Sequence, residues 1–188
     1  CTLACSGLTV YSALQQLLPM KSGSALAIVG LGGLGLSAVP LARKLGFSTI
    51  IACDIADDRL EAALKLGADR VLNTANSEGA EQALKSLAGQ RLHGVIDTVG
   101  SPATVQMAIG AVAKGARVVL VGLHGGQTAL RIPLLPFKAL SLIGSYTGSL
   151  RELQALIALV RQRGIAPLPI YPRPPCCLPD ALSALRRG

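Results

Sequence analysis

Three glycines and one aspartate form the pattern in this chain whose residue types and spacing could do chemistry. Gly30, Gly32 and Gly35 fit G-x-G-x-x-G, and Asp54 lies nineteen residues past the last glycine. In such a pattern the first glycine allows a tight turn, the second lets the backbone approach a pyrophosphate, and the third lets a helix pack closely on a sheet. The N–H groups at the helix start face the anion, and the aspartate can accept hydrogen bonds from ribose hydroxyls. The pattern predicts a dinucleotide-binding site.

Positioning these residues requires strands on either side of a helix, and the sequence predicts such a unit several times over. Apolar runs indicate strands at residues 25–30, 48–53, 70–73, 93–97, 116–121 and 140–144. Helical periodicity indicates helices at 6–18, 33–45, 57–67, 78–88, 101–113, 148–163 and 178–187. Strands that alternate with helices of this length are typical of parallel βαβ units. We therefore expect an α/β fold with a doubly wound parallel six-stranded sheet, the Rossmann fold.

The ends of the later strands supply further candidates, because ligands of doubly wound sheets bind at the carboxyl ends of the strands. The candidate cofactor contacts at these ends are Thr98, Val99, Val121, Gly122, Leu123 and Tyr146. Arg59 follows the aspartate closely enough to flank an adenosine. His124 is the only histidine near this edge, and we do not expect it to act as a proton carrier. Ordinary strand-to-loop connections use the same residue types, so the sequence leaves both interpretations open.

Composition excludes several other classes of protein. The net charge is +8, but the basic residues are scattered and aromatics make up only 3%, so we expect no nucleic-acid partner. Residues 25–42 carry no charge, yet glycines and Pro40 interrupt them, which favours a βα unit over a membrane span. Five cysteines without C-x-x-C, together with a cofactor found inside cells, favour a reducing, cytoplasmic location.

Four blocks of sequence, taken together, resemble the zinc-dependent alcohol dehydrogenases of the medium-chain dehydrogenase/reductase family. These blocks are residues 5–14 (CSGLTVYSAL), 29–35 (VGLGGLG), 95–100 (VIDTVG) and 143–153 (IGSYTGSLREL). They follow the order of the family over nearly the whole chain. The resemblance implies that residues 1–5 end a catalytic domain, 6–146 form the NAD-binding domain, and 147–188 return towards a catalytic domain that this chain lacks.

The resemblance also implies roles for individual residues. Cys5 would be the last ligand of a catalytic zinc, which polarises the substrate oxygen, with the other ligands outside this chain. Without the resemblance, Cys5 would be read as a small buried residue at a helix start. Thr9 would lie under the nicotinamide, and the N–H groups of Gly33 and Leu34 would face the pyrophosphate. The stretch from Val121 to Leu123 would lie on the nicotinamide side.

The leading hypothesis is the cofactor-binding part of an enzyme that transfers a hydride between a primary or secondary alcohol and NAD. We expect the isolated chain to be inactive, the substrate to be a small alcohol or carbonyl compound, and the protein to form a dimer or tetramer. The charge of Asp54 would repel a 2′-phosphate, which favours NAD over NADP. One alternative is a zinc-free NAD(P)H oxidoreductase of the quinone-reductase type, and another is a non-catalytic dinucleotide-binding module. Short-chain dehydrogenases need Tyr-x-x-x-Lys, which the sequence lacks.

Overall fold

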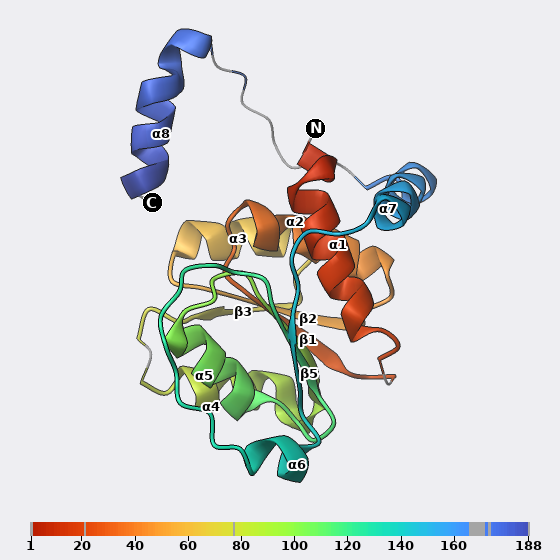
Figure 1. Ribbon diagram of the computed structural model, residues 1–188, viewed down its shortest axis with the longest axis vertical. Coiled ribbons are helices and arrows are strands. Elements are labelled where there is room, and N and C mark those ends of the chain that lie inside the picture. The colour runs from red at the N-terminus through yellow and green to blue at the C-terminus, as the bar shows by residue number, and fades with distance from the viewer. Residues whose placement is uncertain (1, 21, 77, 166–171, 173, 188) are drawn as a thin grey trace.

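The computed structural model describes residues 2–20, 22–76, 78–165, 172 and 174–187 of the 188-residue chain and contains one parallel sheet with helices on both faces (Figure 1). The strands are β1 (Ala25–Val29), β2 (Thr49–Asp54), β3 (Arg70–Asn73), β4 (Leu92–Asp97), β5 (Arg117–Leu120) and β6 (Ser141–Gly144). The helices are α1 (Ser6–Leu17), α2 (Gly33–Lys44), α3 (Asp57–Lys65), α4 (Ala80–Ala88), α5 (Pro102–Ala111), α6 (Leu134–Lys138), α7 (Leu150–Arg163) and α8 (Leu178–Arg187). The α/β fold with six parallel strands is thus confirmed.

The strand order is β3-β2-β1-β4-β5-β6, so the chain reverses direction across the sheet between β1 and β4. Register aligns the carboxyl ends of the strands: Val29 of β1 lies beside Cys53 of β2 and Asp97 of β4. In doubly wound sheets, the point where the strand order reverses is where a crevice opens between the loops that follow the strands. The topology therefore brings the loops after β1, β2 and β4 to one edge.

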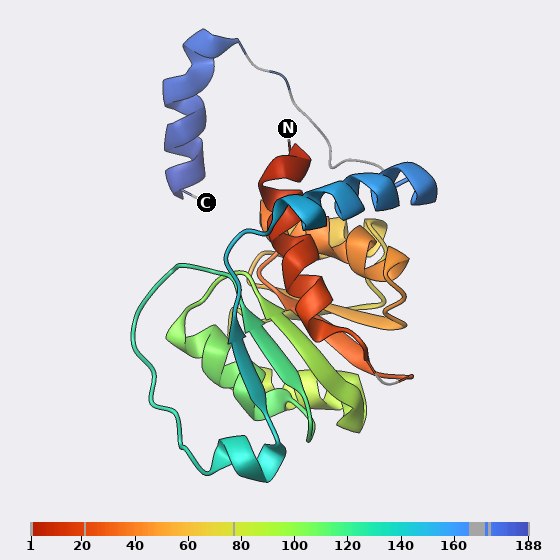
Figure 2. The same ribbon diagram turned by 45° about the vertical axis from the view of Figure 1, so that its right-hand side comes forward.

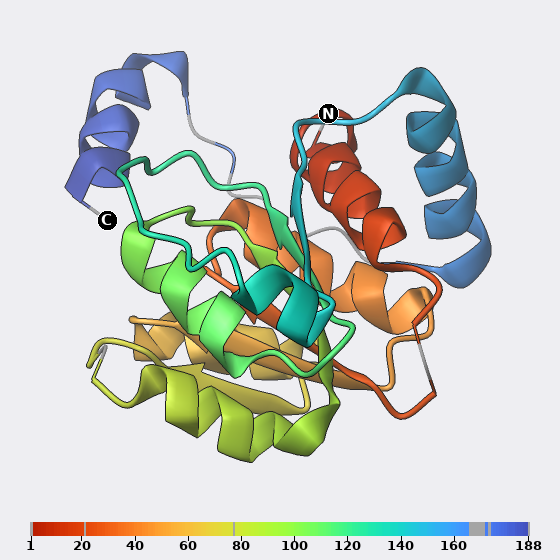
Figure 3. The same ribbon diagram turned by 60° about the horizontal axis from the view of Figure 1, so that its bottom comes forward.

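Both faces of the sheet are covered, which explains the nearly continuous apolar character of the central strands. On one face, Leu26 and Ile28 of β1 belong to a core cluster formed with α1, α2 and α3. On the other face, Ala27 and Val29 pack in a second cluster with α4 and α5. Figure 3 shows these helices on opposite sides of the sheet. Among the described residues, no helix has both the length and the apolar character needed to cross a membrane.

Among the α-helices of the described residues, α6 is the one that the sequence pattern did not predict. It has five residues, LLPFK, and follows Pro133, so it is too short to show a helical period. Helix α7 begins at Leu150 rather than at the expected residue 148, because the Ser149 side chain caps it and accepts a hydrogen bond from the N–H of Glu152. The other elements lie within about two residues of their predicted bounds, the usual spread of helix and strand ends.

Helix α7 lies in the expected return segment, yet it packs beside α1 (Figure 2). Its Leu156 is 0% exposed and belongs to the same core cluster as β1 and α1. The predicted domain boundaries themselves stay predictions, and residues 1, 166–171, 173 and 188 of the two outer segments lie outside the described residues.

Replacing Leu156 with alanine tests whether α7 is an integral part of this core. We expect Leu156→Ala to lower the free energy of unfolding by about 2–5 kcal/mol, because it leaves a cavity among buried side chains. Leu150 on the same helix is 70% exposed, so Leu150→Ala should change that free energy by no more than about 0.5 kcal/mol. Urea denaturation of the two variants measures the difference. Equal, small losses would show that α7 contributes little to the fold.

Candidate functional site

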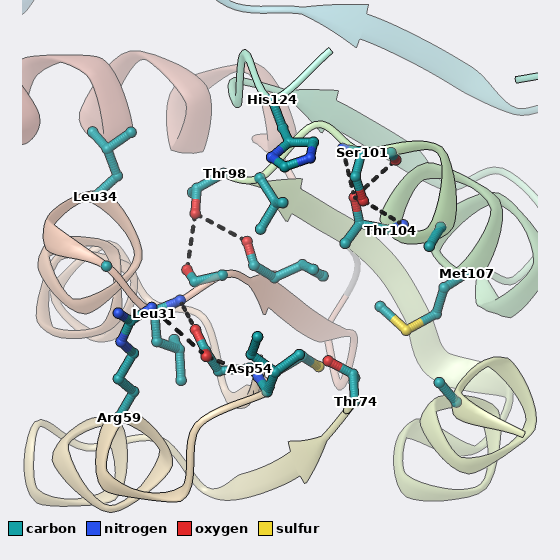
Figure 4. A pocket seen from close by; sticks show the side chains of 18 of the residues that line it. Leu31, Leu34, Asp54, Arg59, Thr74, Thr98, Ser101, Thr104, Met107 and His124 are labelled. Carbon is teal, nitrogen blue, oxygen red and sulfur yellow. Dashed lines mark hydrogen bonds and ion pairs between the residues drawn. The ribbon is translucent and has the colours of Figure 1, made fainter. Parts of the chain in front are cut away.

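A cleft of about 710 Å³ opens at the carboxyl edge of the sheet, where the strand order reverses. This volume lies in the range of small-molecule and cofactor sites. Its lining comes from the loop after β1, the end of β2 and the start of α3, the loop after β4 with α5, and the loop after β5 (Figure 4). The predicted site residues that line it are Gly30, Gly32, Gly33, Leu34, Asp54, Arg59, Thr98, Val99 and Leu123.

The glycine-rich turn between β1 and α2 forms one wall of the cleft. Gly30 has φ of +84°, a backbone conformation that favours glycine, and its N–H donates to the Cys53 carbonyl over 2.8 Å. The Thr98 hydroxyl donates to the Gly30 carbonyl over 2.8 Å, so β2 and the residue that follows β4 both hold Gly30 in place. Behind the turn, a Cβ on Gly35 would overlap the Gly30 carbonyl oxygen. The third glycine of the pattern therefore serves close packing.

The start of α2 is open towards the cleft. No side chain caps it, and a Cβ on Gly32 or Gly33 would meet no atom within 4 Å. The first N–H groups of a helix have no intrahelical acceptor, and they carry the positive end of the helix dipole. This combination of open backbone and free donors fits an anion such as a pyrophosphate.

Asp54 lies at the end of β2 and faces the glycine-rich turn. Its residue is 6% exposed, and its Oδ2 accepts a hydrogen bond from the Leu31 N–H over 2.5 Å. The Oδ1 atom accepts from the N–H groups of Ile55 and Ala56 over 2.8 and 3.1 Å. The Arg59 guanidinium lies 3.9 Å from Oδ1. A carboxylate offers about four acceptor positions, so Oδ2 keeps room for a further donor such as a ribose hydroxyl.

Beside Asp54, Cys53 also lines the cleft but has no nucleophilic character. Burial, together with the neighbouring negative charge of Asp54, raises the pKa of the Cys53 thiol to about 12. Because the thiolate is the reactive form, this side chain acts as a small apolar part of the wall.

Six predicted site residues do not line the cleft. Gly35 lies behind the glycine-rich turn, Val121 is buried directly after β5, and Gly122 packs against the backbone of Val99. Thr9 is buried in α1, and Tyr146 is 78% exposed in the segment after β6. Cys5, read from the sequence alone as buried, is exposed at the start of α1.

Sequence reasoning missed several residues that line the cleft: Ile55, Thr74, Ala80, Ser101, Ala103, Thr104 and Met107. Thr74 could have been found, because it directly follows the third predicted strand. Ser101 caps α5 by accepting from the Thr104 N–H, and a serine before a helix is itself a recognisable pattern. The apolar lining residues of α4 and α5 could not have been found, because apolar residues on a helix are as typical of the core as of a cleft lining.

Zinc does not fit the described residues by themselves. Among the residues that the structure describes, no three His, Cys, Asp or Glu side chains are grouped closely enough to hold a metal ion. Protein zinc sites use three or four such ligands, so Cys5 could supply one ligand at most.

Comparison with known proteins places this architecture in a family. The sequence model of the family described as zinc-binding dehydrogenase matches residues 33–162. A protein named NAD-dependent alcohol dehydrogenase, from Sulfurisphaera tokodaii, is 30% identical over 167 residues, which are 88% of this chain and 48% of that protein.

Solved structures with the same fold also include alcohol dehydrogenases. An alcohol dehydrogenase from the hyperthermophilic archaeon Aeropyrum pernix superposes with a TM-score of 0.90 at 29% identity, over 100% of this chain and 54% of that one. The D-arabinose dehydrogenase from Sulfolobus solfataricus superposes with a TM-score of 0.79 at 27% identity, over 91% of this chain and 54% of that one. The chain therefore spans about half the length of these relatives. It belongs to the zinc-binding dehydrogenases, the medium-chain dehydrogenase/reductase family of the zinc-type alcohol dehydrogenases.

Proposed function

We propose that this chain is the NAD-binding half of an alcohol dehydrogenase. One observation supports the proposal most strongly: the open start of α2 and the Asp54 carboxylate line the same cleft, joined by the 2.5 Å hydrogen bond from Leu31. A pyrophosphate needs the first group and an adenosine ribose needs the second. The names of two relatives, an NAD-dependent alcohol dehydrogenase and an alcohol dehydrogenase, agree with this function.

Different residues of the cleft lining bind different parts of the cofactor. The N–H groups of Gly33 and Leu34 bind the pyrophosphate, and Asp54 accepts from the adenosine ribose. The adenine lies against the apolar wall that Ile55 and Met107 provide, while Thr98, Val99 and Leu123 contact the nicotinamide half. When bound, the nicotinamide ring supplies the hydride acceptor or donor; the chain itself binds and orients it and excludes water.

The arrangement favours NAD over NADP. A 2′-phosphate would come close to the Asp54 carboxylate, and like charges in a partly buried site repel strongly. Arg59 lies beside that carboxylate and is 41% exposed in its side chain, so it offsets the repulsion only in part. This charge balance also disfavours the zinc-free quinone-reductase alternative with an NADPH preference.

The remaining parts of the function belong to the whole protein. Its substrate is a small alcohol or carbonyl compound, and a catalytic zinc is held by Cys5 together with ligands from outside this chain. The edge strand β6 pairs only with β5 among the described strands, which leaves an edge for a second copy in a dimer or tetramer. Its location is the cytoplasm, where cysteines stay reduced and the cofactor is present.

Titrating the purified 188-residue chain with NADH tests the proposal. We expect saturable binding, with a dissociation constant below about 1 mM, seen as a change in NADH fluorescence and displaced by ADP-ribose. We also expect no oxidation of ethanol or benzyl alcohol by this chain alone, because a large part of the active site lies outside it.

Four outcomes would contradict the proposal in different ways. Absence of NADH binding would show that the cleft is not a dinucleotide-binding site. Tighter binding of NADPH than of NADH would favour the quinone-reductase alternative. Alcohol turnover by the isolated chain would show that the active site is complete within it. In the full-length protein, cofactor binding without alcohol-dependent hydride transfer would favour a non-catalytic binding module.

A further inference from the structure

Two segments at the carboxyl edge of the sheet form a single platform: residues 97–100, which begin at the last residue of β4, and residues 121–125, which follow β5. The N–H groups of Val121 and Gly122 both donate to the Asp97 carbonyl, over 2.9 and 3.0 Å. Further along, the His124 N–H donates to the Val99 carbonyl over 3.0 Å. Side chains of both segments line the cleft, among them Val99 and His124.

Backbone packing couples the two segments tightly. A Cβ on Gly100 would overlap the Gly122 carbonyl, and a Cβ on Gly122 would overlap the Val99 carbonyl group. No side chain therefore separates the segments, and a displacement of residues 99–100 must be passed to residues 122–125. Val99 also packs against the first glycine of the turn, since a Cβ on Gly30 would overlap its Cγ2.

The side chain of Asp97 fixes the position of this platform. Its Oδ1 accepts hydrogen bonds from the N–H groups of Val99 and Gly100, over 2.9 and 3.0 Å. The residue is 0% exposed, so it cannot touch a ligand in the cleft. Its Oδ2 has no hydrogen-bond partner among the described residues. A buried carboxylate oxygen without a partner lowers stability, so a fully buried aspartate here is hard to explain by stability alone.

We propose that Asp97 is a positioning residue for cofactor binding: by holding Val99 and Gly100, it sets where both segments of the platform lie against the cofactor. This inference rests on the proposed function, since it assumes that the cofactor occupies this cleft. What the side chain must provide is an acceptor for two N–H groups; its negative charge is not required.

Alanine and asparagine variants separate these roles. Asp97→Ala should weaken NADH binding by about tenfold or more, because two buried N–H groups lose their acceptor and the platform shifts. Asp97→Asn keeps an acceptor oxygen and should bind NADH within about twofold of the original chain. Asp69→Ala is the matched control, because Asp69 also accepts a backbone N–H, that of Ile50, but does not line the cleft. It should lower the melting temperature and leave NADH affinity unchanged.

A second pair of variants displaces the platform without changing Asp97. Gly100 and Gly115 have similar φ angles, +72° and +78°, so alanine is equally strained at both. Only at Gly100 would the new Cβ overlap the other segment; at Gly115 it meets no atom within 4 Å. Gly100→Ala should therefore weaken NADH binding about tenfold or more, and Gly115→Ala should not. This pair keeps the proposal testable if Asp97→Ala does not fold.

Amide hydrogen exchange distinguishes failure of this inference from failure of the proposed function, because it needs no cofactor. In Asp97→Ala, or in Gly100→Ala if the former does not fold, the His124 amide should exchange about tenfold faster, while in Asp69→Ala it should not. Unchanged exchange at His124, unchanged NADH affinity, or an equal loss in Asp97→Asn and Asp97→Ala would each overturn the role given to Asp97. Faster His124 exchange in the variants, together with an original chain that does not bind NADH, would overturn the proposed function and leave Asp97 as a structural residue only.

Discussion

Gly35→Ala is expected to abolish measurable NADH binding and to destabilise the fold by about 3 kcal/mol, near the upper end of the usual cost of overpacking. The new Cβ would overlap the carbonyl oxygen of Gly30, a backbone atom held in place by the Thr98 hydroxyl. Neither side can move freely, because the Gly30 N–H is bonded to β2 and Gly35 lies in the first turns of α2. The strain must push the helix start away from the strand, and with it the N–H groups that face the cleft. Thermal unfolding and NADH titration measure the two effects.

Gly33→Ala is the control for stability in this experiment. It adds the same methyl group to the same helix two residues earlier, where a Cβ would meet no atom within 4 Å. Alanine is a better helix former than glycine, so Gly33→Ala should leave the melting temperature of the free protein unchanged or raised. A Gly35→Ala variant as stable as Gly33→Ala would show that the close contact with Gly30 is not needed.

The second large effect is expected from Asp54→Asn, which should reduce the preference for NADH over NADPH by about 10- to 100-fold, the worth of about one hydrogen bond to a charged group. An amide has one acceptor oxygen, so it cannot serve Leu31 on one side and Ile55 and Ala56 on the other. Affinity for NADH therefore falls. Loss of the charge also removes repulsion of a 2′-phosphate and leaves Arg59 free to bind it.

Titrations with NADH and NADPH, each on the original chain and on Asp54→Asn, give the change in preference. Asp58→Asn removes the same charge from the exposed first turn of α3, outside the lining of the cleft, and should leave the preference within about twofold of its original value. An equal change in both variants would mean that general electrostatics, and not contact with the cofactor, sets the preference.

Most of the fold could be predicted from the sequence because local and global patterns agree. Buried strands such as β1 are continuous apolar runs, and a helix of about the expected length separates each of the first four strands from the next, so the parallel sheet follows. Helix α6 could not be predicted, because five residues with an internal proline carry no period. Its position depends on contacts made far away in the sequence.

The parts of the candidate site that depend on backbone conformation could be predicted from the sequence. The turn at Gly30 and the approach of Gly35 follow from residue type alone, since only glycine fits there. The hydrogen bond from the Leu31 N–H to Asp54 could not be predicted, because a carboxylate beside a loop can accept hydrogen bonds from any of several nearby backbone N–H groups. The same limit applies to Met107, because a helix pattern does not tell which apolar side chains face a cleft and which face the core. The cofactor contacts assigned to Thr9 and Tyr146 stay predictions, because neither residue lines the cleft.

The three N–H groups that hold Asp54 have a consequence for the energetics of recognition. Because the carboxylate is already fixed before any ligand arrives, its rotamer freedom is lost during folding and not during binding. Preorganisation of this kind lowers the entropic cost of association, and it raises affinity without adding a contact. The hydrogen bond from the Leu31 N–H occupies part of Oδ2, which a ribose hydroxyl could otherwise use, but it also holds the carboxylate in the orientation that the ribose needs.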